Sequence, residues 1–260
     1  MSNSAAKTPV VTKSDLEKNF SSLGLSPGDV VAFHTSLSAF GYVEGGADAV
    51  IDAILEAIGP GGTALAPTLT FDRRWSPEVP PVFDVRTTPS VTGRTPEVFR
   101  KRPGAIRSLH PTHSWTAIGA RAVEYTTGHE DSLTPCGPRS PLGRLAGDPR
   151  GKVLLLGADL RCCTFLHYCE EVAAVPYHLQ QRPTHVVMTD AEGHKVERDC
   201  YLHRWPDEPT DFTKPEAELV RLGIMRKRRI GNAEIRLLKA RETADFVIDK
   251  LRGDAHYLLA

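Results

Sequence analysis

The chain has 260 residues, in which 32 lysines and arginines balance 32 aspartates and glutamates. Hydrophobic residues make up 40% of the chain and charged residues 25%, which are ordinary values for a globular enzyme. A balanced chain has no overall field that attracts nucleic acid, and no apolar run approaches the roughly 20 residues that span a bilayer, so we expect neither partner.

The first half of the chain alternates predicted helices and strands. Residues 1–11 are polar and lack the apolar core of a secretory signal, so we expect a flexible tail there and one domain over residues 12–260. Residues 70–96, rich in Pro, Arg and Thr, predict a long functional loop. The regular elements expected before it are a helix over residues 14–24, a strand over 29–34, a helix over 47–58 and a strand over 63–67.

The second half continues the alternation. KVLLLGA at residues 152–158 predicts a third buried strand, followed by a helix that reaches about Pro176. Residues 188–200 predict a hairpin around a turn at 190–193, and residues 242–251 a closing helix. Continuous apolar strands separated by helices are typical of an α/β protein whose sheet is covered on both faces.

The loop HTSLSAFG, residues 34–41, follows the first buried strand. Small hydroxyl residues that lead from a strand toward a helix supply donors for an anion such as a pyrophosphate. An ordinary strand–helix connection with a Ser cap fits the same pattern. The Gly-Lys-Ser/Thr ending of a Walker loop is missing, so a nucleotide triphosphate site of that kind is not expected.

The segment RSLHPTHSW, which begins at Arg107, contains two histidines three positions apart. His110 and His113 suggest zinc, but Pro111 opposes a helix and no Cys-x-x-Cys or His-Glu-x-x-His pattern accompanies them. We therefore expect no metal. A loop whose Arg, Ser and His side chains bind phosphate or substrate is the preferred interpretation.

The segment GADLRCCTFLHYCEE, residues 157–171, runs from a strand end into a helix. Ligands gather at the carboxyl ends of strands in α/β sheets. Glu170 and Glu171 follow His167 at helical spacing, so a carboxylate can share the face of the imidazole. A lone helical histidine is usually structural, but this position makes His167 a candidate general base.

The five cysteines allow a second chemistry, in which Cys163 is the nucleophile of a Cys–His hydrolase. The glycine pattern of a strained nucleophile turn is missing, and adjacent cysteines such as Cys162 and Cys163 more often pack in a core. An odd number of cysteines without a regular framework predicts reduced thiols. We therefore expect a cytoplasmic protein.

Taken together, the motifs resemble the antibiotic N-acetyltransferase family, typified by the aminoglycoside 3-N-acetyltransferases. The similarity extends from Asp15 to about Leu251. The resemblance implies a three-layer α/β/α sandwich, which is not the GNAT fold; a loose R-x-x-G-x-A match at residues 228–233 is too weak to indicate GNAT. The matching stretches, in order, cover residues 33–68, 88–119, 138–145, 151–177 and 230–246.

The resemblance also implies site residues. The catalytic base in the T-x-x-H-x-x-E block falls on His167, with Glu170 as its supporting acid. Family members carry further acids after the hairpin, where this chain reads YLHRWPDEPTDF. His203 or Trp205 stands at the position of an acid, and Asp207 is the nearest substitute for that acid. The implied substrate-binding residues are Asp72, His110 and Glu171. The implied acetyl-CoA contacts are His34, Thr35, Ser36, Ser38, Phe40, Arg107 and Ser108.

The activity implied is direct transfer of acetyl from acetyl-CoA to a primary amine, in a ternary complex that needs no metal. The expected acceptor is the 3-amino group of an aminoglycoside antibiotic, which would make the chain a resistance enzyme. A different amine is the first alternative. The second is a non-catalytic CoA-binding protein, which the altered YLHRWPDE segment favours. The protein is expected to be a monomer or a homodimer.

Overall fold

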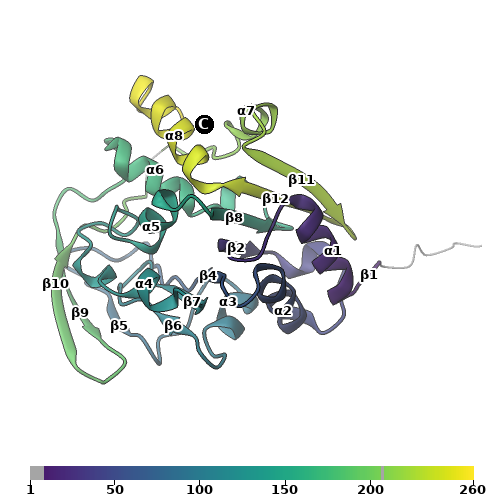
Figure 1. Cartoon of the computed structure of the whole chain (residues 1–260). Helices are drawn as coiled ribbons and strands as arrows, with labels where there is room; N and C mark the ends of the chain where they lie inside the picture. Colours follow the sequence, from purple (N-terminus) through teal and green to yellow (C-terminus); the bar gives the residue numbers. More distant parts are fainter. Residues whose placement is uncertain (1–8, 206–207) are drawn as a thin grey trace, which may run out of the picture.

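The computed structural model describes residues 9–205 and 208–260 and has a mixed α/β architecture around a seven-stranded sheet (Figure 1). The three strands predicted from apolar runs are its central members, and they are parallel to one another. The outer strands pair antiparallel. In spatial order the strands are β11 (Met225–Ile230), β12 (Ala233–Lys239), β8 (Gly151–Leu156), β2 (Val30–Thr35), β4 (Thr63–Pro67), β7 (Trp115–Gly119) and β6 (Ile106–Arg107).

Both faces of this sheet are buried under helices. Successive side chains of a strand point to opposite faces, so Val31 and Phe33 pack into one core and Val30 and Ala32 into the other. Burial of each large apolar side chain contributes roughly 1.5–3 kcal/mol. The first core contains side chains of α1 (Lys13–Leu23), α2 (Gly46–Ile58) and α3 (Arg94–Phe99). The second contains side chains of α4 (Ala122–Thr126), α5 (Pro141–Gly147), α6 (Phe165–Ala173), α7 (Glu216–Arg221) and α8 (Ala240–Gly253).

The start of the described chain is more ordered than the predicted tail. Residues 1–8 lie outside the described part, but β1 (Val10–Val11) pairs in parallel with β3 (Tyr42–Val43). Thr12 then caps α1 through a reciprocal capping box with Asp15. The predicted tail over residues 1–11 is therefore wrong at its last two residues, because main-chain pairing fixes them.

The predicted loop over residues 70–96 contributes a strand to a second sheet. The predicted hairpin is confirmed as β9 (Thr184–Thr189) and β10 (Lys195–Cys200), with β9 beginning before Met188. From the loop, β5 (Val82–Asp84) pairs in parallel with β9. The small core under this three-stranded sheet includes Phe83 and Val186. The sheet lies at one edge of the molecule in Figure 1.

The helix predicted after β8 is interrupted. A short 3₁₀ turn, η3 (Leu160–Cys162), comes first, because the Asp159 side chain accepts a hydrogen bond from the Arg161 N–H at 3.0 Å. The α6 helix follows and ends at Ala174 in the left-handed conformation. Cys163 therefore lies between two helical segments, and His167 lies in the first turn of α6. Two further 3₁₀ turns are η1 (Leu37–Phe40) and η2 (His129–Asp131).

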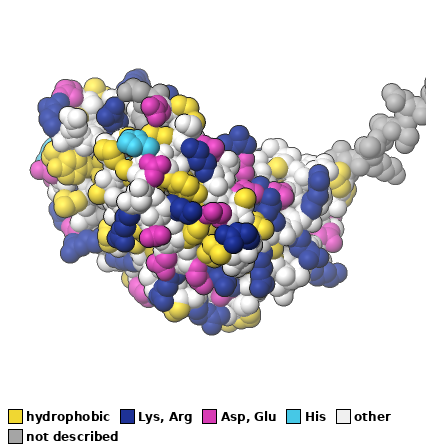
Figure 2. All heavy atoms as spheres, turned by 90° about the horizontal axis from the view of Figure 1, so that it is seen from above, with side chains coloured by type: hydrophobic (Ala, Val, Ile, Leu, Met, Phe, Trp, Pro, Cys, Tyr) yellow, Lys and Arg dark blue, Asp and Glu magenta, His cyan; other side chains and the backbone are white. Residues whose placement is uncertain are grey.

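The surface carries charges of both signs. Figure 2 shows lysine and arginine side chains interspersed with aspartate and glutamate over the face seen from above. Within residues 9–205 and 208–260, no helix combines the length and the apolar character that a membrane crossing requires. Residues 228–233, the loose GNAT-like match, form the ends of β11 and β12 and the turn between them.

Candidate active site

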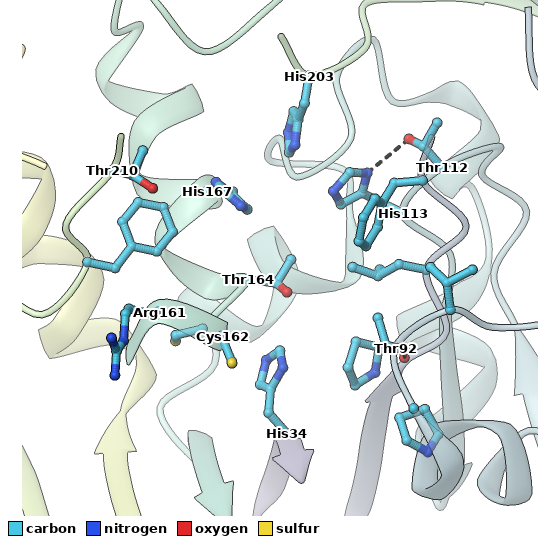
Figure 3. A pocket seen from close by; sticks show the side chains of 18 of the residues that line it. His34, Thr92, Thr112, His113, Arg161, Cys162, Thr164, His167, His203 and Thr210 are labelled. Atoms are coloured by element: carbon cyan, nitrogen blue, oxygen red, sulfur yellow. Dashed lines mark hydrogen bonds between the residues drawn. The ribbon is translucent and has the colours of Figure 1, made fainter. Parts of the chain in front are cut away.

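A cavity of about 650 Å³ lies where the central strands end. Its wall includes His34 and Thr35 at the end of β2, Pro67 at the end of β4, and Ala158 just after β8. This is the edge at which α/β sheets bind ligands. His167 from α6 and His113 and His203 from loops point into the same space (Figure 3). Aromatic side chains of the wall are Phe71, Trp75, Trp205 and Phe212.

His167 and Glu170 form a dyad on α6. Nδ1 of His167 lies 2.7 Å from Oε2 of Glu170, whose side chain is fully buried. The Tyr177 hydroxyl donates to the other carboxylate oxygen at 3.0 Å. Because a carboxylate accepts hydrogen bonds, Nδ1 of His167 carries the proton and Nε2 keeps its lone pair. The geometry therefore provides an oriented proton acceptor that lines the cavity.

A second carboxylate–imidazole pair lies beside the first. Nε2 of His203 is 2.7 Å from Oε1 of Glu171, and this oxygen also accepts the Cys136 N–H at 2.8 Å. Burial raises the pKa of Glu171 to about 8 and lowers the pKa of His203 well below its ordinary value. At neutral pH the pair is thus a neutral acid hydrogen-bonded to a neutral imidazole. Glu171, predicted to bind substrate, instead holds His203, which lines the cavity.

Histidine rings cluster around the base. The ring centroids of His178 and His203 are 4.0 Å apart, those of His113 and His203 4.3 Å, and those of His167 and His178 4.8 Å. Burial lowers the pKa of His113 and of His178 well below the ordinary value. These rings are therefore neutral at pH 7 and present no charge that repels an ammonium group. Sequence reasoning placed His113 in a loop predicted to bind phosphate or substrate, but gave His178 and His203 no catalytic or binding role.

Only some residues of the predicted acetyl-CoA loop line the cavity. His34, Thr35 and Ser36 line the cavity, whereas Ser38 is exposed on η1 and Phe40 is fully buried in the α1–α2 core. Burial lowers the pKa of His34 to about 4, and its Nε2 atom is buried without a hydrogen-bond partner. The Ser36 N–H donates to the Leu156 carbonyl at 2.8 Å, so this N–H is not available to a ligand in the cavity.

Arg107 does not line the cavity. Its guanidinium donates to the main-chain carbonyls of Thr88 at 2.5 Å and Thr68 at 2.7 Å and to the Ser114 hydroxyl at 2.9 Å. It also lies over the Phe83 ring at 4.8 Å. These contacts consume the donors that a phosphate would need. They favour a structural role, in which Arg107 links β6 to the segment that follows β4.

Ser108 and His110 are buried outside the cavity wall as well. The Ser108 hydroxyl accepts the Trp115 N–H at 2.8 Å and lies 2.9 Å from Nδ1 of His129. His110 stacks on His129 with ring centroids 4.6 Å apart, and its Nδ1 accepts the His113 N–H at 3.0 Å. The contacts of both side chains shape the turn that carries His113 toward the cavity.

The predicted acids and the candidate thiol differ in their placement. Asp72 lines the cavity, but hydrogen bonds from Arg74 lower the pKa of its carboxyl to about 2 and satisfy both oxygens. Asp207 lies outside the described residues. Cys163 is a buried part of the wall, and burial raises its pKa to about 12. A thiol held protonated is a poor nucleophile.

Similarity to known proteins identifies the family of this chain. The family model described as aminoglycoside 3-N-acetyltransferase matches residues 33–252. Aminoglycoside N(3)-acetyltransferase VII of Streptomyces paromomycinus is 34% identical, over 91% of this chain and 90% of its own length. The crystal structure of aminoglycoside acetyltransferase AAC(3)-Xa is 34% identical, superposes with a TM-score of 0.80, and covers 96% of this chain and 94% of its own.

A second solved structure contains a ligand. AAC-IIIb, solved as a binary complex with CoASH, is 29% identical with a TM-score of 0.78, over 94% of this chain and 97% of its own. The predicted mixed α/β fold class and the predicted CoA-dependent N-acetyltransferase class are both confirmed by these similarities. The chain belongs to the aminoglycoside 3-N-acetyltransferase family.

Proposed function

We propose that this protein transfers acetyl from acetyl-CoA to a primary amine, the 3-amino group of an aminoglycoside, with His167 as general base. The observation that carries the proposal is the His167–Glu170 dyad on the wall of a cavity at the strand ends. The name of the Streptomyces paromomycinus relative supports the acceptor, and the CoASH complex of AAC-IIIb supports the acetyl donor.

The chemistry follows from the state of the two reactants. An ammonium has no lone pair for attack, so Nε2 of His167 first removes a proton from the acceptor, and the freed lone pair of the acceptor nitrogen attacks the thioester carbonyl. The C–N bond forms and the C–S bond breaks. CoA leaves as its thiol after taking the proton held by His167, and the nitrogen releases its second proton to water. Base catalysis of this kind is worth about 10²–10⁴-fold in rate. Glu170 fixes the tautomer of His167 and stabilises the imidazolium that forms.

The reactants are assigned to opposite walls of the cavity. His34, Thr35 and Ser36 are proposed to face acetyl-CoA, since they lie at the end of β2 in the loop that the family resemblance marks. The neutral rings of His113 and His203 are proposed to accept hydrogen bonds from the amine. Asp72 is retained as a substrate contact on the opposite loop.

A different amine remains the second candidate acceptor, and one observation favours it. A polycationic aminoglycoside gains from unpaired carboxylates, yet the carboxylate of Asp72 is paired with Arg74. A smaller amine of lower charge would depend less on such carboxylates.

Four further properties belong to this proposal. The helices on both sheet faces support a three-layer α/β/α sandwich distinct from GNAT, built as one domain over residues 12–260. The reaction needs no metal. The protein is proposed to be cytoplasmic and to be a monomer or a homodimer, as expected from the sequence.

Replacement of Cys163 by alanine should leave most of the activity, because direct transfer needs no protein thiol. The cost is one of packing, about 0.5–3 kcal/mol in the free energy of unfolding. Intact-mass spectrometry after mixing the wild-type protein with acetyl-CoA, before any amine is added, should show no acetylated chain. An acetyl adduct on Cys163, together with a folded but inactive Cys163→Ala variant, would establish a covalent route instead.

A further inference from the structure

Three histidines of the cluster have the geometry of a metal site. One ligand atom from each of His167, His178 and His203 lies within 4.8 Å of the others. Zinc–nitrogen bonds of about 2.0–2.1 Å place the nitrogens of a tetrahedral site about 3.3 Å apart. Small side-chain rotations are therefore enough to bring three imidazoles onto one ion.

Carboxylates orient all three rings. Glu170 lies 2.7 Å from Nδ1 of His167 and 3.3 Å from Nδ1 of His178, and Glu171 lies 2.7 Å from Nε2 of His203. Nε2 of His167 and Nδ1 of His203 are thus left for a ligand, whereas Nε2 of His178 lies 3.9 Å from Oε1 of Glu171, beyond hydrogen-bond distance. Hydrogen-bond partners behind the imidazoles, such as these carboxyl groups, orient histidines in zinc proteins and strengthen them as ligands.

One of these nitrogens has no hydrogen-bond partner. His178 is 5% exposed at its side chain, and its Nε2 atom is buried without a hydrogen bond within the described chain. A buried polar atom without a partner costs free energy unless a ligand satisfies it.

We propose that His167, His178 and His203 form a site for a divalent transition cation such as Zn²⁺, with its remaining coordination position open to the cavity. Imidazole nitrogen favours zinc, cobalt and nickel over magnesium and calcium. Because the ion takes the lone pair of His167, its binding inhibits acetyl transfer. That consequence rests on the proposed function, whereas binding of the ion does not.

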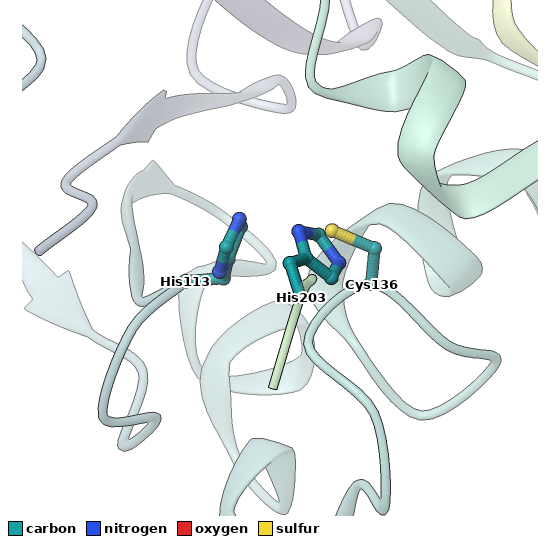
Figure 4. A group of neighbouring side chains, drawn as sticks. All are labelled: His113, Cys136 and His203. Atoms are coloured by element: carbon teal, nitrogen blue, oxygen red, sulfur yellow. The ribbon is translucent and has the colours of Figure 1, made fainter. Parts of the chain in front are cut away.

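Two other groups in the described chain are weaker candidates. His113, Cys136 and His203 lie together (Figure 4), but burial raises the pKa of the Cys136 thiol well above its ordinary value. A metal needs the thiolate. The third group, Asp190, Glu192 and His194, lies in the turn between β9 and β10 and offers a single imidazole.

Titration of the full chain with Co²⁺ tests the site by visible absorption and calorimetry. We expect one Co²⁺ per chain, with an affinity that falls at least tenfold in His178→Ala and in His178→Gln. The matched controls Cys136→Ser and His194→Ala, one for each alternative group, should bind like the wild type. Retained binding of CoA shows that a variant is folded.

The outcomes distinguish failure of the metal site from failure of the proposed function. Absence of saturable Co²⁺ binding, or loss of binding in Cys136→Ser or His194→Ala but not in the His178 variants, overturns the proposed site. Zn²⁺ should suppress formation of the N-acetylated amine, measured by mass spectrometry, and EDTA should restore it. Co²⁺ binding as expected in a protein that acetylates no amine supports the metal site and overturns the proposed function.

Discussion

The His167→Ala variant is expected to lose about 10²–10⁴-fold in kcat for acetyl transfer, because it removes the general base. Affinity for CoA should stay close to that of the wild type, since the cavity residues at the end of β2 are untouched. The measurement is amine-dependent release of the CoA thiol, with CoA binding followed by calorimetry on the same samples.

His194→Ala is the control for this experiment. His194 is exposed in the turn between β9 and β10, so its loss should change neither kcat nor CoA affinity. If His167→Ala turns over at a rate near that of the wild type, His167 is not the general base. A parallel loss of CoA affinity in His167→Ala would show that the ring binds the cofactor instead.

The Glu170→Gln variant is expected to lose up to about 10⁴-fold in kcat, the scale seen when an amide replaces the acid behind a catalytic histidine. The amide N–H₂ can donate to Nδ1 of His167, which then carries the lone pair, while the proton moves to Nε2. The imidazole stays in place but faces the amine in the wrong tautomer. KM for both substrates should change far less than kcat.

Glu171→Gln is the matched control, because the two acids are neighbours on α6 and both of their side chains are buried. The raised pKa of Glu171, about 8, keeps its carboxyl neutral at pH 7, so a neutral amide replaces it with little electrostatic change. Its kcat at pH 7 should fall much less than that of Glu170→Gln. Equal losses in the two variants would mean that Glu170 acts through packing rather than through the tautomer of His167.

The helices and strands that are marked by a local pattern of apolar residues could be predicted from the sequence. The apolar runs at β2, β4 and β8 are buried on both faces, and burial on both faces is what makes a strand read as a continuous apolar run. His167 and Glu170 were predictable as a pair because helical spacing alone brings them to one face.

The remainder of the site depends on contacts between distant segments. The rings of His178 and His203 lie beside that of His167. His178 comes from the loop after α6 and His203 from the loop after β10, and the residues around them show no helical or strand periodicity that would predict these contacts. Arg107 looked like a phosphate ligand because sequence does not reveal that the carbonyls of Thr68 and Thr88 occupy its donors. The pairing of β5 with β9 is likewise invisible in a Pro-rich stretch.

Amine-dependent turnover of acetyl-CoA tests the central claim most directly. The wild-type protein should be mixed with acetyl-CoA and a panel of aminoglycosides and simpler primary amines, and thiol release should be compared with the N-acetylated product identified by mass spectrometry and NMR. We expect one thiol per acetylated amine, acetylation at the 3-amino group of an aminoglycoside, and no release without amine. Tight binding of CoA without turnover of any amine, or release of thiol by hydrolysis alone, would contradict it.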